Sequence, residues 1–423
     1  MTEPPEARPV RGRFAKQERS ERTRRAIAEA VIAVLAERGV SGLTHRLVAQ
    51  RAGASLAATT YYYQSKGDMV GDASNELFRL YLAQFTRAAE RVHGGGPAGY
   101  LAFVAHVCSE GVGTHARGAL AWFEIIFDGA RDEAVQNLSR TWFERLEDVW
   151  VRIADAFGMS KPMDAARCGI DLTIGALIHG LSLGLTGQDL GAALTGRGPA
   201  ENVLGRAAGP EDQHAQKDRL TGKAARTRQR LLEAAIHLLA EGGAAAVTYR
   251  AVALRAGCSR AAPAYHFLSS AELLTEAQLL LNVRAKARYR QIMNDSVSQA
   301  DLETMIELTA VIFQREATEF RAVNLAGYAI WTEAARRPEV RPVVERVLAD
   351  FYQAWRKRFV ALGAASGSLE ALLVQFLFVG AQVRVFATGV TPNDLVRARA
   401  GLRDDIAALA QRRHWVQEGQ LVG

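Results

Sequence analysis

A short run of hydroxyl-bearing and aromatic residues is the part of this chain best suited to chemistry. The members that we expect to be exposed are Leu56, Thr59, Thr60, Tyr61 and Tyr62. Such side chains can contact base edges and thymine methyl groups in the major groove of DNA. The surrounding residues 44–66 predict a helix, a tight turn and a second helix, which is the shape that enters a major groove. A plain hairpin inside an α-helical bundle would give the same local pattern.

Three residues set the geometry of this motif. Thr44 and Ser55 are placed to cap the two helices, and Gly53 lies at the reversal, where glycine tolerates a positive φ. The same three types recur at a constant offset, as Thr248, Gly257 and Ser259. Roughly 22 of about 48 aligned positions are identical without a gap, which identifies an internal repeat.

The spacings that carry catalysis are missing from the sequence. No nucleophile elbow, HExxH or phosphate-binding loop occurs. Gly94, Gly96 and Gly99 have dinucleotide-loop spacing, but no strand is expected before them. His106 and Cys108 diverge on their expected helix, which argues against a shared metal ion. We therefore expect no enzyme, no cofactor and no metal site.

The bulk composition favours a helical protein with several cores. The chain has 423 residues, about half of them hydrophobic, and this length predicts about three compact units. The net charge of +7 is compatible with a polyanionic partner. Three widely spaced cysteines suggest a reducing cytoplasm, and the N-terminus lacks the apolar core of a signal peptide. Polar residues interrupt the two longest apolar runs, so we expect no membrane span.

Proline, glycine and charge divide the chain into two similar units. The first unit comprises a disordered basic arm at 1–19, a helix–turn–helix domain at 20–67 and a helical domain at 68–194. A glycine-, proline- and charge-rich linker at 195–217 follows. The second unit comprises a helix–turn–helix domain at 218–271, a helical domain at 272–414 and a tail at 415–423.

Each unit resembles a TetR-family transcriptional repressor. The shared pattern runs from Arg-Thr-Arg in the first helix, through T-x-R-x-V-A-x-R-A-G-x-S, to an aromatic-x-Ser junction before the fourth helix. The resemblance implies an all-α fold of two tandem units, each with a three-helix DNA-binding head and a larger helical domain. It also implies a small-molecule pocket between the middle helices and a four-helix interface made by the last two helices of each unit.

The second unit departs from the family pattern near its reading helix. The junction lysine of the family is kept as Lys66 and replaced by Ser270, which implies weaker DNA binding by the second head. Pro263 lies in the first turn of that reading helix, where its missing N–H is tolerable.

We expect three layers of DNA contact. Phosphate contacts, which are sensitive to salt and carry no sequence information, would come from Arg24, Lys66, Arg226 and Arg228. Contacts at helix N-termini would come from Thr44, Ser55, Thr248 and Ser259. Contacts to bases or thymine methyl groups would come from Leu56, Thr59, Thr60, Tyr61, Arg260, Tyr265 and His266, and Tyr62 is a further DNA-binding candidate on the same helix. Of these, Arg260 alone has a fork that suits guanine.

A mostly apolar effector pocket is expected among the helices that follow each head. The candidate lining residues are Trp122, Phe123, Phe127, Trp142 and His179 in the first unit and Tyr328, Trp331, Phe376 and Gln382 in the second. Aromatic residues at helical spacing serve equally well as plain core.

The fusion of two units changes what one chain can do. A family that works as a homodimer on palindromic DNA implies that this chain is a pseudo-dimer, with 169–186 and 369–411 at the internal interface. The reading helices differ, so we expect an asymmetric double-stranded operator. We therefore expect a cytoplasmic, ligand-responsive transcriptional regulator, which would be a repressor because most members of the family are. The rival interpretation is a helical ligand sensor or scaffold in which only the first head, or neither, reads DNA; further pairing of chains stays open.

Overall fold

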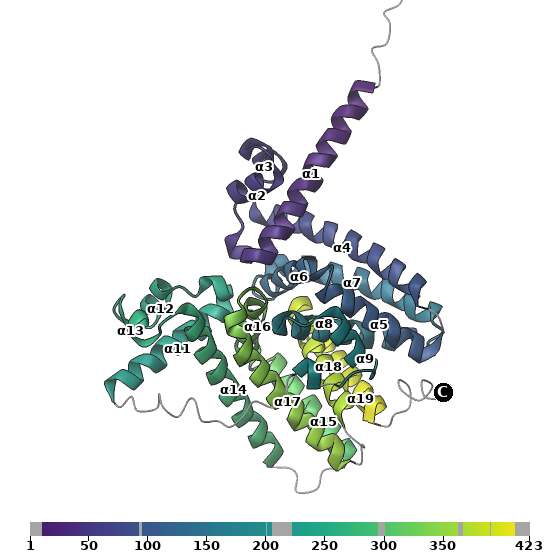
Figure 1. Cartoon of the computed structure of the whole chain (residues 1–423), viewed down its shortest axis with the longest axis vertical. Helices are drawn as coiled ribbons and strands as arrows, with labels where there is room; N and C mark the ends of the chain where they lie inside the picture. Colours follow the sequence, from purple (N-terminus) through teal and green to yellow (C-terminus); the bar gives the residue numbers. More distant parts are fainter. Residues whose placement is uncertain are drawn as a thin grey trace, which may run out of the picture.

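Every regular element in the described part of the chain is a helix. The computed structural model describes residues 11–92, 95–199, 201–204, 222–294, 301–362, 367–389 and 391–410. The all-α fold predicted from composition and periodicity is confirmed (Figure 1).

The first unit begins with a head made of three helices and continues into a bundle. We call α1–α3 the first head. The helices are α1 (Arg11–Arg38), η1 (Val40–Gly42), α2 (His45–Ala52), α3 (Leu56–Tyr62), α4 (Lys66–Arg91), α5 (Gly96–Val112), α6 (Ala116–Gly129), α7 (Glu133–Ala156), α8 (Pro162–Leu183), α9 (Gly187–Leu194) and α10 (Glu201–Leu204).

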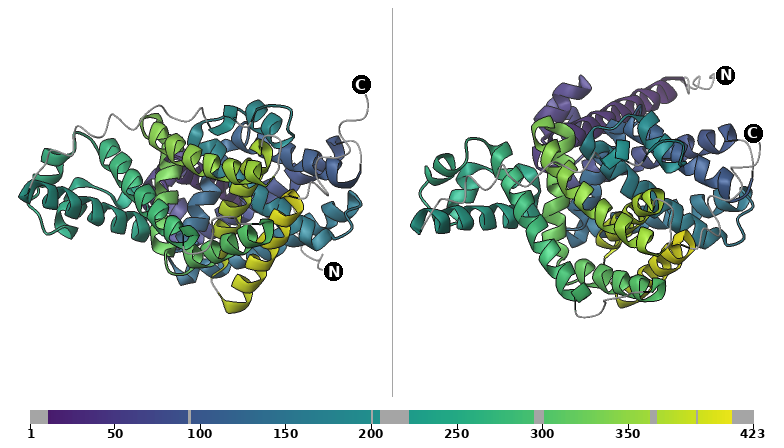
Figure 2. Two further views of the ribbon diagram at one scale, coloured as in Figure 1. Left: turned by 90° about the horizontal axis from the view of Figure 1, so that it is seen from below. Right: turned by 60° about the horizontal axis from the view of Figure 1, so that its bottom comes forward.

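The second unit repeats this order. We call α11–α13 the second head, which protrudes from the body of helices in both views of Figure 2. The helices are α11 (Lys223–Gly242), η2 (Ala244–Ala246), α12 (Tyr249–Arg255), α13 (Ala262–His266), α14 (Ser270–Asn294), α15 (Leu302–Ala317), α16 (Arg321–Arg336), η3 (Pro338–Val340), α17 (Arg341–Ala361), α18 (Ser368–Thr388) and α19 (Pro392–Ala410).

Two expected boundaries differ from the structure. The first helix starts at Arg11 and not at Ser20, so the second half of the expected disordered arm is helical; residues 1–10 lie outside the described residues. The expected linker starts later than 195, because α10 is helical and the side chains of Val203 and Leu204 are buried. Residues 205–221, which hold the rest of the linker, and the tail at 415–423 lie outside the described residues.

The two units meet where α8 and α18 cross. A Cβ added to Gly175 would lie 1.9 Å from the carbonyl oxygen of Phe376, and one added to Gly380 would lie 1.8 Å from that of Asp171. The two helix backbones are therefore in direct contact, which only glycine allows at these positions. On one side of the crossing, Arg384 donates to both carboxylate oxygens of Asp171 at 2.7 and 2.8 Å.

One of these helices has the length and hydropathy of a membrane span. It is α18, and 83% of its most apolar window is buried inside the protein. Its apolar character is thus accounted for by packing in the centre of the fold.

Candidate nucleic-acid interface and ligand cavity

The first head has the capped helix–turn–helix that its sequence predicts. The Thr44 hydroxyl accepts the Leu47 N–H at 3.2 Å, and the Ser55 hydroxyl accepts the Ala58 N–H at 3.1 Å. Gly53 ends α2 in the left-handed region, with φ of 61°. Both caps and the turn are confirmed, and they hold α3 as a short helix on the surface of the head.

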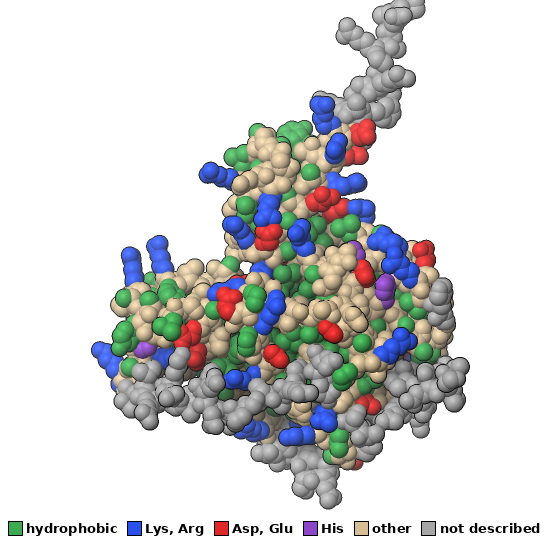
Figure 3. Space-filling model, viewed as in Figure 1, with side chains coloured by type: hydrophobic (Ala, Val, Ile, Leu, Met, Phe, Trp, Pro, Cys, Tyr) green, Lys and Arg blue, Asp and Glu red, His purple; other side chains and the backbone are tan. Residues whose placement is uncertain are grey.

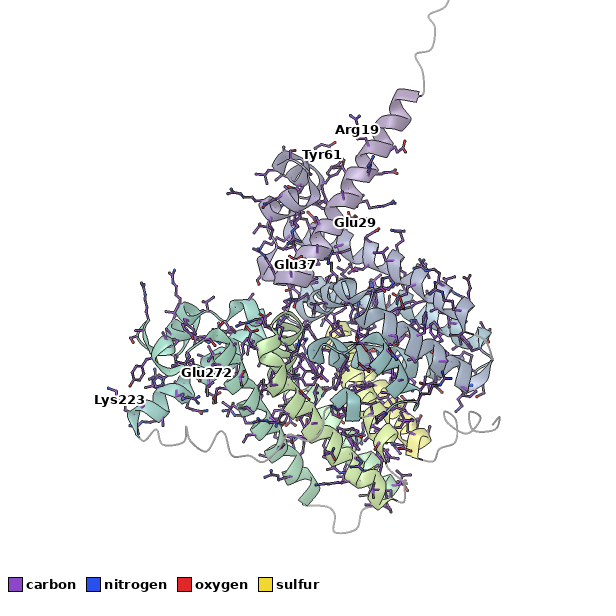
Figure 4. All side chains as sticks on the ribbon, viewed as in Figure 1. Arg19, Glu29, Glu37, Tyr61, Lys223 and Glu272 are labelled. Atoms are coloured by element: carbon purple, nitrogen blue, oxygen red, sulfur yellow. The ribbon has the colours of Figure 1, made fainter. Side chains whose placement is uncertain are left out.

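The outer face of α3 is apolar and aromatic. Tyr61 is 83% exposed and Leu56 is 53% exposed, and Thr60 is exposed beside them. Figure 4 shows Tyr61 on the outer part of the head, away from the body of helices. Thr59 is fully buried, so its expected base contact is wrong: the side chain points into the head, and its hydroxyl donates to the Leu56 carbonyl.

Tyr62 joins α3 to α1. Its hydroxyl lies 2.9 Å from the Ser20 hydroxyl, and its ring is half-buried. The expected exposure of Tyr62 is therefore wrong, because the ring is half-buried and the phenol is engaged with α1. The hydroxyl pair joins α3 to α1 within the first head.

Arg24 is held by a carboxylate and is not a free phosphate ligand. It donates to both oxygens of Asp72 at 2.9 and 2.6 Å, and the Tyr63 hydroxyl donates to the same carboxylate at 2.5 Å. Burial, followed by the Asp72 contact, raises the pKa of Tyr63. The Arg24 side chain is still 59% exposed, so it retains a face toward solvent.

The second head repeats this arrangement with a more buried arginine. Arg228 pairs with Glu276 at 3.0 Å, is only 16% exposed, and lies over the Phe267 ring at 5.0 Å. The expected phosphate contact by Arg228 is therefore wrong: the side chain fastens α11 to α14. The other two expected phosphate ligands, Lys66 and Arg226, are exposed.

The second reading helix is shorter than the first. In the first head, the backbone N–H of Thr59 donates to the carbonyl oxygen of Ser55. Pro263 stands at the repeat position of Thr59 and has no N–H to make this bond, so α13 starts only at Ala262. Ser259 makes no side-chain cap there, unlike Ser55, whereas Thr248 caps α12 through the Ala251 N–H at 3.1 Å.

The surface of the second head nevertheless offers aromatic and basic side chains. Tyr265 is 84% exposed, Leu268 is 94% exposed and Arg260 is exposed. His266 is half-buried, and burial and the nearby Arg228 lower its pKa. Lysine and arginine side chains stand out on both heads (Figure 3).

The aromatic residues expected to line a pocket in the first unit form solid core. Trp122, Phe123, Phe127 and Trp142 are almost completely buried, and neighbouring rings lie 5.0–5.9 Å apart. They line neither the 760 Å³ cavity between α14 and α18 nor the smaller hollow beside Arg336 and Arg341. The indole nitrogens of Trp122 and Trp142 have no hydrogen-bond partner among the described residues, and the ligand role of these four residues stays a prediction.

Two further candidates lie at the crossing of the units. His179 is fully buried and contacts the Phe376 ring at 4.9 Å; its Nδ1 lies 2.7 Å from the Gly175 carbonyl oxygen and its Nε2 lies 3.1 Å from the Gln375 side-chain nitrogen. Burial lowers the pKa of His179 to about 4, so the ring is neutral. Both side chains serve the interface, and the expected pocket role is wrong for them.

A cavity does open in the second unit. It encloses about 760 Å³ between α14, α15, α16, α17 and α18. Three of the expected residues line it, Tyr328, Trp331 and Gln382, and the Tyr328 hydroxyl donates to the Gln382 oxygen at 2.5 Å. The position of Trp122 in α6 matches Gly327 in α16, since Leu-Ala-Trp-Phe in one unit aligns with Leu-Ala-Gly-Tyr in the other. A Cβ on Gly327 would meet no atom within 4 Å, so the cavity is open where the first unit carries an indole.

Several polar atoms in this cavity have no hydrogen-bond partner among the residues that the structure describes. They are Gln278 Oε1, Asn282 Oδ1, Trp331 Nε1, Gln375 Oε1 and Gln382 Nε2. Buried polar atoms of this kind are normally satisfied by protein, water or a ligand. Sequence reasoning missed Gln278 and Asn282, because single polar residues on a long helix carry no periodic signal.

The charges around the cavity are unequal. The acidic side chains are paired, Glu316 with Arg288 at 2.9 Å and Asp350 with Lys286 at 2.6 Å. Arg358 lies over the Trp355 ring at 5.5 Å and makes no ion pair with the described residues. Burial lowers the pKa of Arg358, which marks a partly desolvated cation without a counter-charge.

Family models match the helical domains of both units and the head of the second unit. The model described as Tetracyclin repressor-like, C-terminal domain, matches residues 95–208 and 300–412, and the model of bacterial regulatory proteins, tetR family, matches residues 231–277. A search of curated proteins finds no match.

Solved structures of regulators resemble single units of the chain. A transcriptional regulator from Saccharomonospora viridis in complex with choline is 23% identical, with a TM-score of 0.38, and the match covers 43% of this chain and 96% of that one. A regulator from Streptomyces coelicolor is 24% identical over 44% of this chain and 98% of that one, with a TM-score of 0.35. The multidrug binding protein EbrR complexed with proflavin is 26% identical over 43% and 99%, with a TM-score of 0.32.

The repeated C-terminal match covers more than half of the chain, and a head of the same family lies between its two copies. The chain therefore belongs to the TetR family of bacterial transcriptional regulators and carries two TetR-like units in tandem.

Proposed function

We propose that the protein is a cytoplasmic, ligand-responsive repressor in which one chain acts as a pseudo-dimer on an asymmetric operator. The observation that carries the proposal is the crossing of α8 and α18 at Gly175 and Gly380, where each helix lays its glycine on the backbone of the other unit. A two-fold interface has this reciprocal form, in which the same position serves on both sides.

The interface also discriminates between the two units. Asp171 pairs with Arg384 on one side of the crossing, whereas the corresponding positions on the other side are Phe376 and His179. Pairing of two first units would leave Asp171 facing neutral His179, and pairing of two second units would leave Arg384 facing Phe376. An unpaired buried charge is costly, so the arrangement favours joining the two different units of one chain.

Unequal heads on a pseudo-dimer imply unequal half-sites. The first head would read through Leu56, Thr60 and Tyr61, and the second through Arg260 and Tyr265. Two such heads read half-sites about one helical turn apart, roughly 34–36 Å. Lys66, Arg226 and the solvent face of Arg24 would add phosphate contacts that salt weakens.

The cavity of the second unit is the proposed effector site. Its aromatic wall, its unpartnered amides and the uncompensated Arg358 suit an aromatic or otherwise apolar molecule with hydrogen-bonding groups and one acidic group. One chain would then bind one effector, because Trp122 fills the corresponding place in the first unit.

A second candidate is a regulator in which only the first head reads DNA. The short α13 favours it, and so does Ser270, which replaces the junction lysine and is bound to Arg337 at 3.1 Å. In the extreme form of this alternative, neither head binds DNA and the protein is a ligand sensor or a scaffold.

Salt dependence of DNA affinity separates these possibilities. The affinity for duplex DNA, measured by fluorescence anisotropy, should fall steeply and linearly on logarithmic axes, and each lost phosphate contact should reduce the slope by about one. Lys66→Ala should reduce it for the first head and Arg226→Ala for the second. A flat profile for the native protein would reject the regulator, and an effect of Lys66→Ala alone would leave one reading head.

A further inference from the structure

Helix α16 belongs to the second unit but is bound to the first unit at both ends. At its N-terminus, Arg321 donates to the carbonyl oxygen of Ala130, which follows α6. At its C-terminus, Arg336 donates to the carbonyl oxygens of Ala36 at 2.7 Å and Leu35 at 3.2 Å. These two carbonyls lie at the end of α1, so α16 reaches from one unit into the head of the other.

The contact at Arg336 is well suited to hold a helix end. Carbonyls in the last turn of a helix carry partial negative charge, which attracts a guanidinium; the Leu35 carbonyl also accepts the Gly39 N–H at 2.9 Å. Glu124 of α6 accepts from the same guanidinium at 2.7 Å, and the Arg336 side chain is only 12% exposed. We call this contact the α1 clasp.

A matching clasp runs in the opposite direction. Arg131, which follows α6 in the first unit, donates to the carbonyl oxygens of Ala240 at 2.9 Å and Leu239 at 3.3 Å, at the end of α11. Ala240 and Leu239 occupy the repeat positions of Ala36 and Leu35. We call this the α11 clasp; each unit thus holds the first helix of the other unit's head.

The two clasps differ in what lies behind them. Asn324, Gly327, Tyr328 and Trp331 on α16 line the cavity of the second unit, and Trp331 precedes Arg336 on the same helix. The α11 clasp is attached to α6, whose Trp122 is buried in core. Of the two clasps, the α1 clasp is therefore the one attached to a helix that lines the 760 Å³ cavity in the described part of the chain.

We propose that an occupant of the second-unit cavity controls the first head through α16 and the Arg336 clasp. This rests on the proposed function, to which it adds the route of regulation. Because packed interiors transmit a displacement instead of absorbing it, an occupant pressed against Tyr328 and Trp331 shifts α16 and loosens the hold on α1. Helix α16 also packs against α11, so the same movement reaches the second head directly. One cavity then serves two heads.

Hydrogen–deuterium exchange on the full chain tests this route without DNA. The probe is 1-anilinonaphthalene-8-sulfonate, an aromatic anion whose fluorescence reports entry into an apolar cavity. In the native chain, saturating probe should speed amide exchange in the last turn of α1 by about three- to tenfold, the effect of losing one or two hydrogen bonds. In Arg336→Ala the same amides should already exchange fast and should not respond to bound probe.

Arg131→Ala is the matched control. It should speed exchange at the end of α11 while the response of α1 to the probe stays at its native size. A Gly327→Trp variant places an indole where Trp122 stands in the first unit, beside an intact α11 clasp, so it should exclude the probe and leave exchange at the end of α1 at its native rate. The proposal is overturned if α1 responds to bound probe equally in Arg336→Ala, or if saturating bound probe leaves exchange at α1 of the native chain unchanged.

These outcomes are independent of DNA binding. A protein that shows no salt-dependent affinity for DNA would refute the proposed function and still report whether the cavity and α1 are coupled. A protein that binds DNA but shows no coupling would keep the function and lose the route.

Discussion

Replacing Gly380 by alanine should separate the two units at their closest contact. The added methyl group would start 1.8 Å from the carbonyl oxygen of Asp171 and 2.6 Å from its carbonyl carbon. Ordinary contact begins near 3.4 Å, so the two helices must move apart by about 1.6 Å at this point. The obstacle is backbone in the middle of a helix, and it cannot turn away as a side chain could.

The cost of this separation should be large for a single methyl group. Overpacking a close-packed core typically costs about 1–3 kcal/mol and occasionally more, and the rigid obstacle argues for the upper end, about 3 kcal/mol. Gly175→Ala should cost a similar amount, because its Cβ would start 1.9 Å from the carbonyl oxygen of Phe376. Equal effects at the two sites would reflect the reciprocal form of the crossing.

Urea unfolding of the full chain, followed by circular dichroism, measures the effect. Gly71→Ala in α4 is the matched control, since its Cβ would meet no atom within 4 Å and alanine favours a helix over glycine by about 1 kcal/mol. The control should be neutral or stabilising. Free energies of unfolding for Gly380→Ala and Gly71→Ala that agree within about 0.5 kcal/mol would refute the close crossing, because surface substitutions commonly differ by that much.

Three other predictions follow from single side chains. The folded-state pKa of His179 is about 4, below its unfolded value, so the native state binds fewer protons and stability should fall as pH drops from about 6.5 toward 4; the loss should reach about 3 kcal/mol and be absent in His179→Gln, in urea unfolding at each pH. Thr59→Val should leave DNA affinity unchanged because Thr59 is buried, whereas Tyr61→Ala should lower it by about 1–3 kcal/mol in anisotropy titrations; equal losses would contradict the assigned face of α3. Gly327→Trp should abolish binding of 1-anilinonaphthalene-8-sulfonate, and Trp122→Gly should create a second site; undiminished binding to Gly327→Trp would place the probe elsewhere.

Local features of the heads could be predicted from the sequence. The caps at Thr44 and Ser55 and the left-handed Gly53 depend only on residues within a few positions, so residue type and spacing suffice. The inward orientation of Thr59 depends on which face of α3 meets α1 and α2. Its hydroxyl character suggested exposure, and the packing of the three helices decided otherwise.

Features that join distant segments could not be predicted in the same way. The first unit has a buried indole, Trp122, at the position where the second unit has Gly327 and an open cavity. This difference can be recognised only after α6 and α16 are aligned. Arg131 follows the end of α6 and Arg336 ends α16, and neither position has a sequence pattern that suggests a contact. Their carbonyl partners are about one hundred and three hundred positions away in the sequence. Alignment of the second halves of the units would have shown that both arginines recur, although not what they bind.

The most direct test of the account is a selection from a random duplex library with the full chain, followed by native mass spectrometry of the complex on the enriched site. A pseudo-dimer should select an asymmetric sequence with two different half-sites about one helical turn apart, bound by one chain. A palindrome bound by two chains would contradict the pseudo-dimer, and no enriched sequence at low salt would contradict the regulator itself.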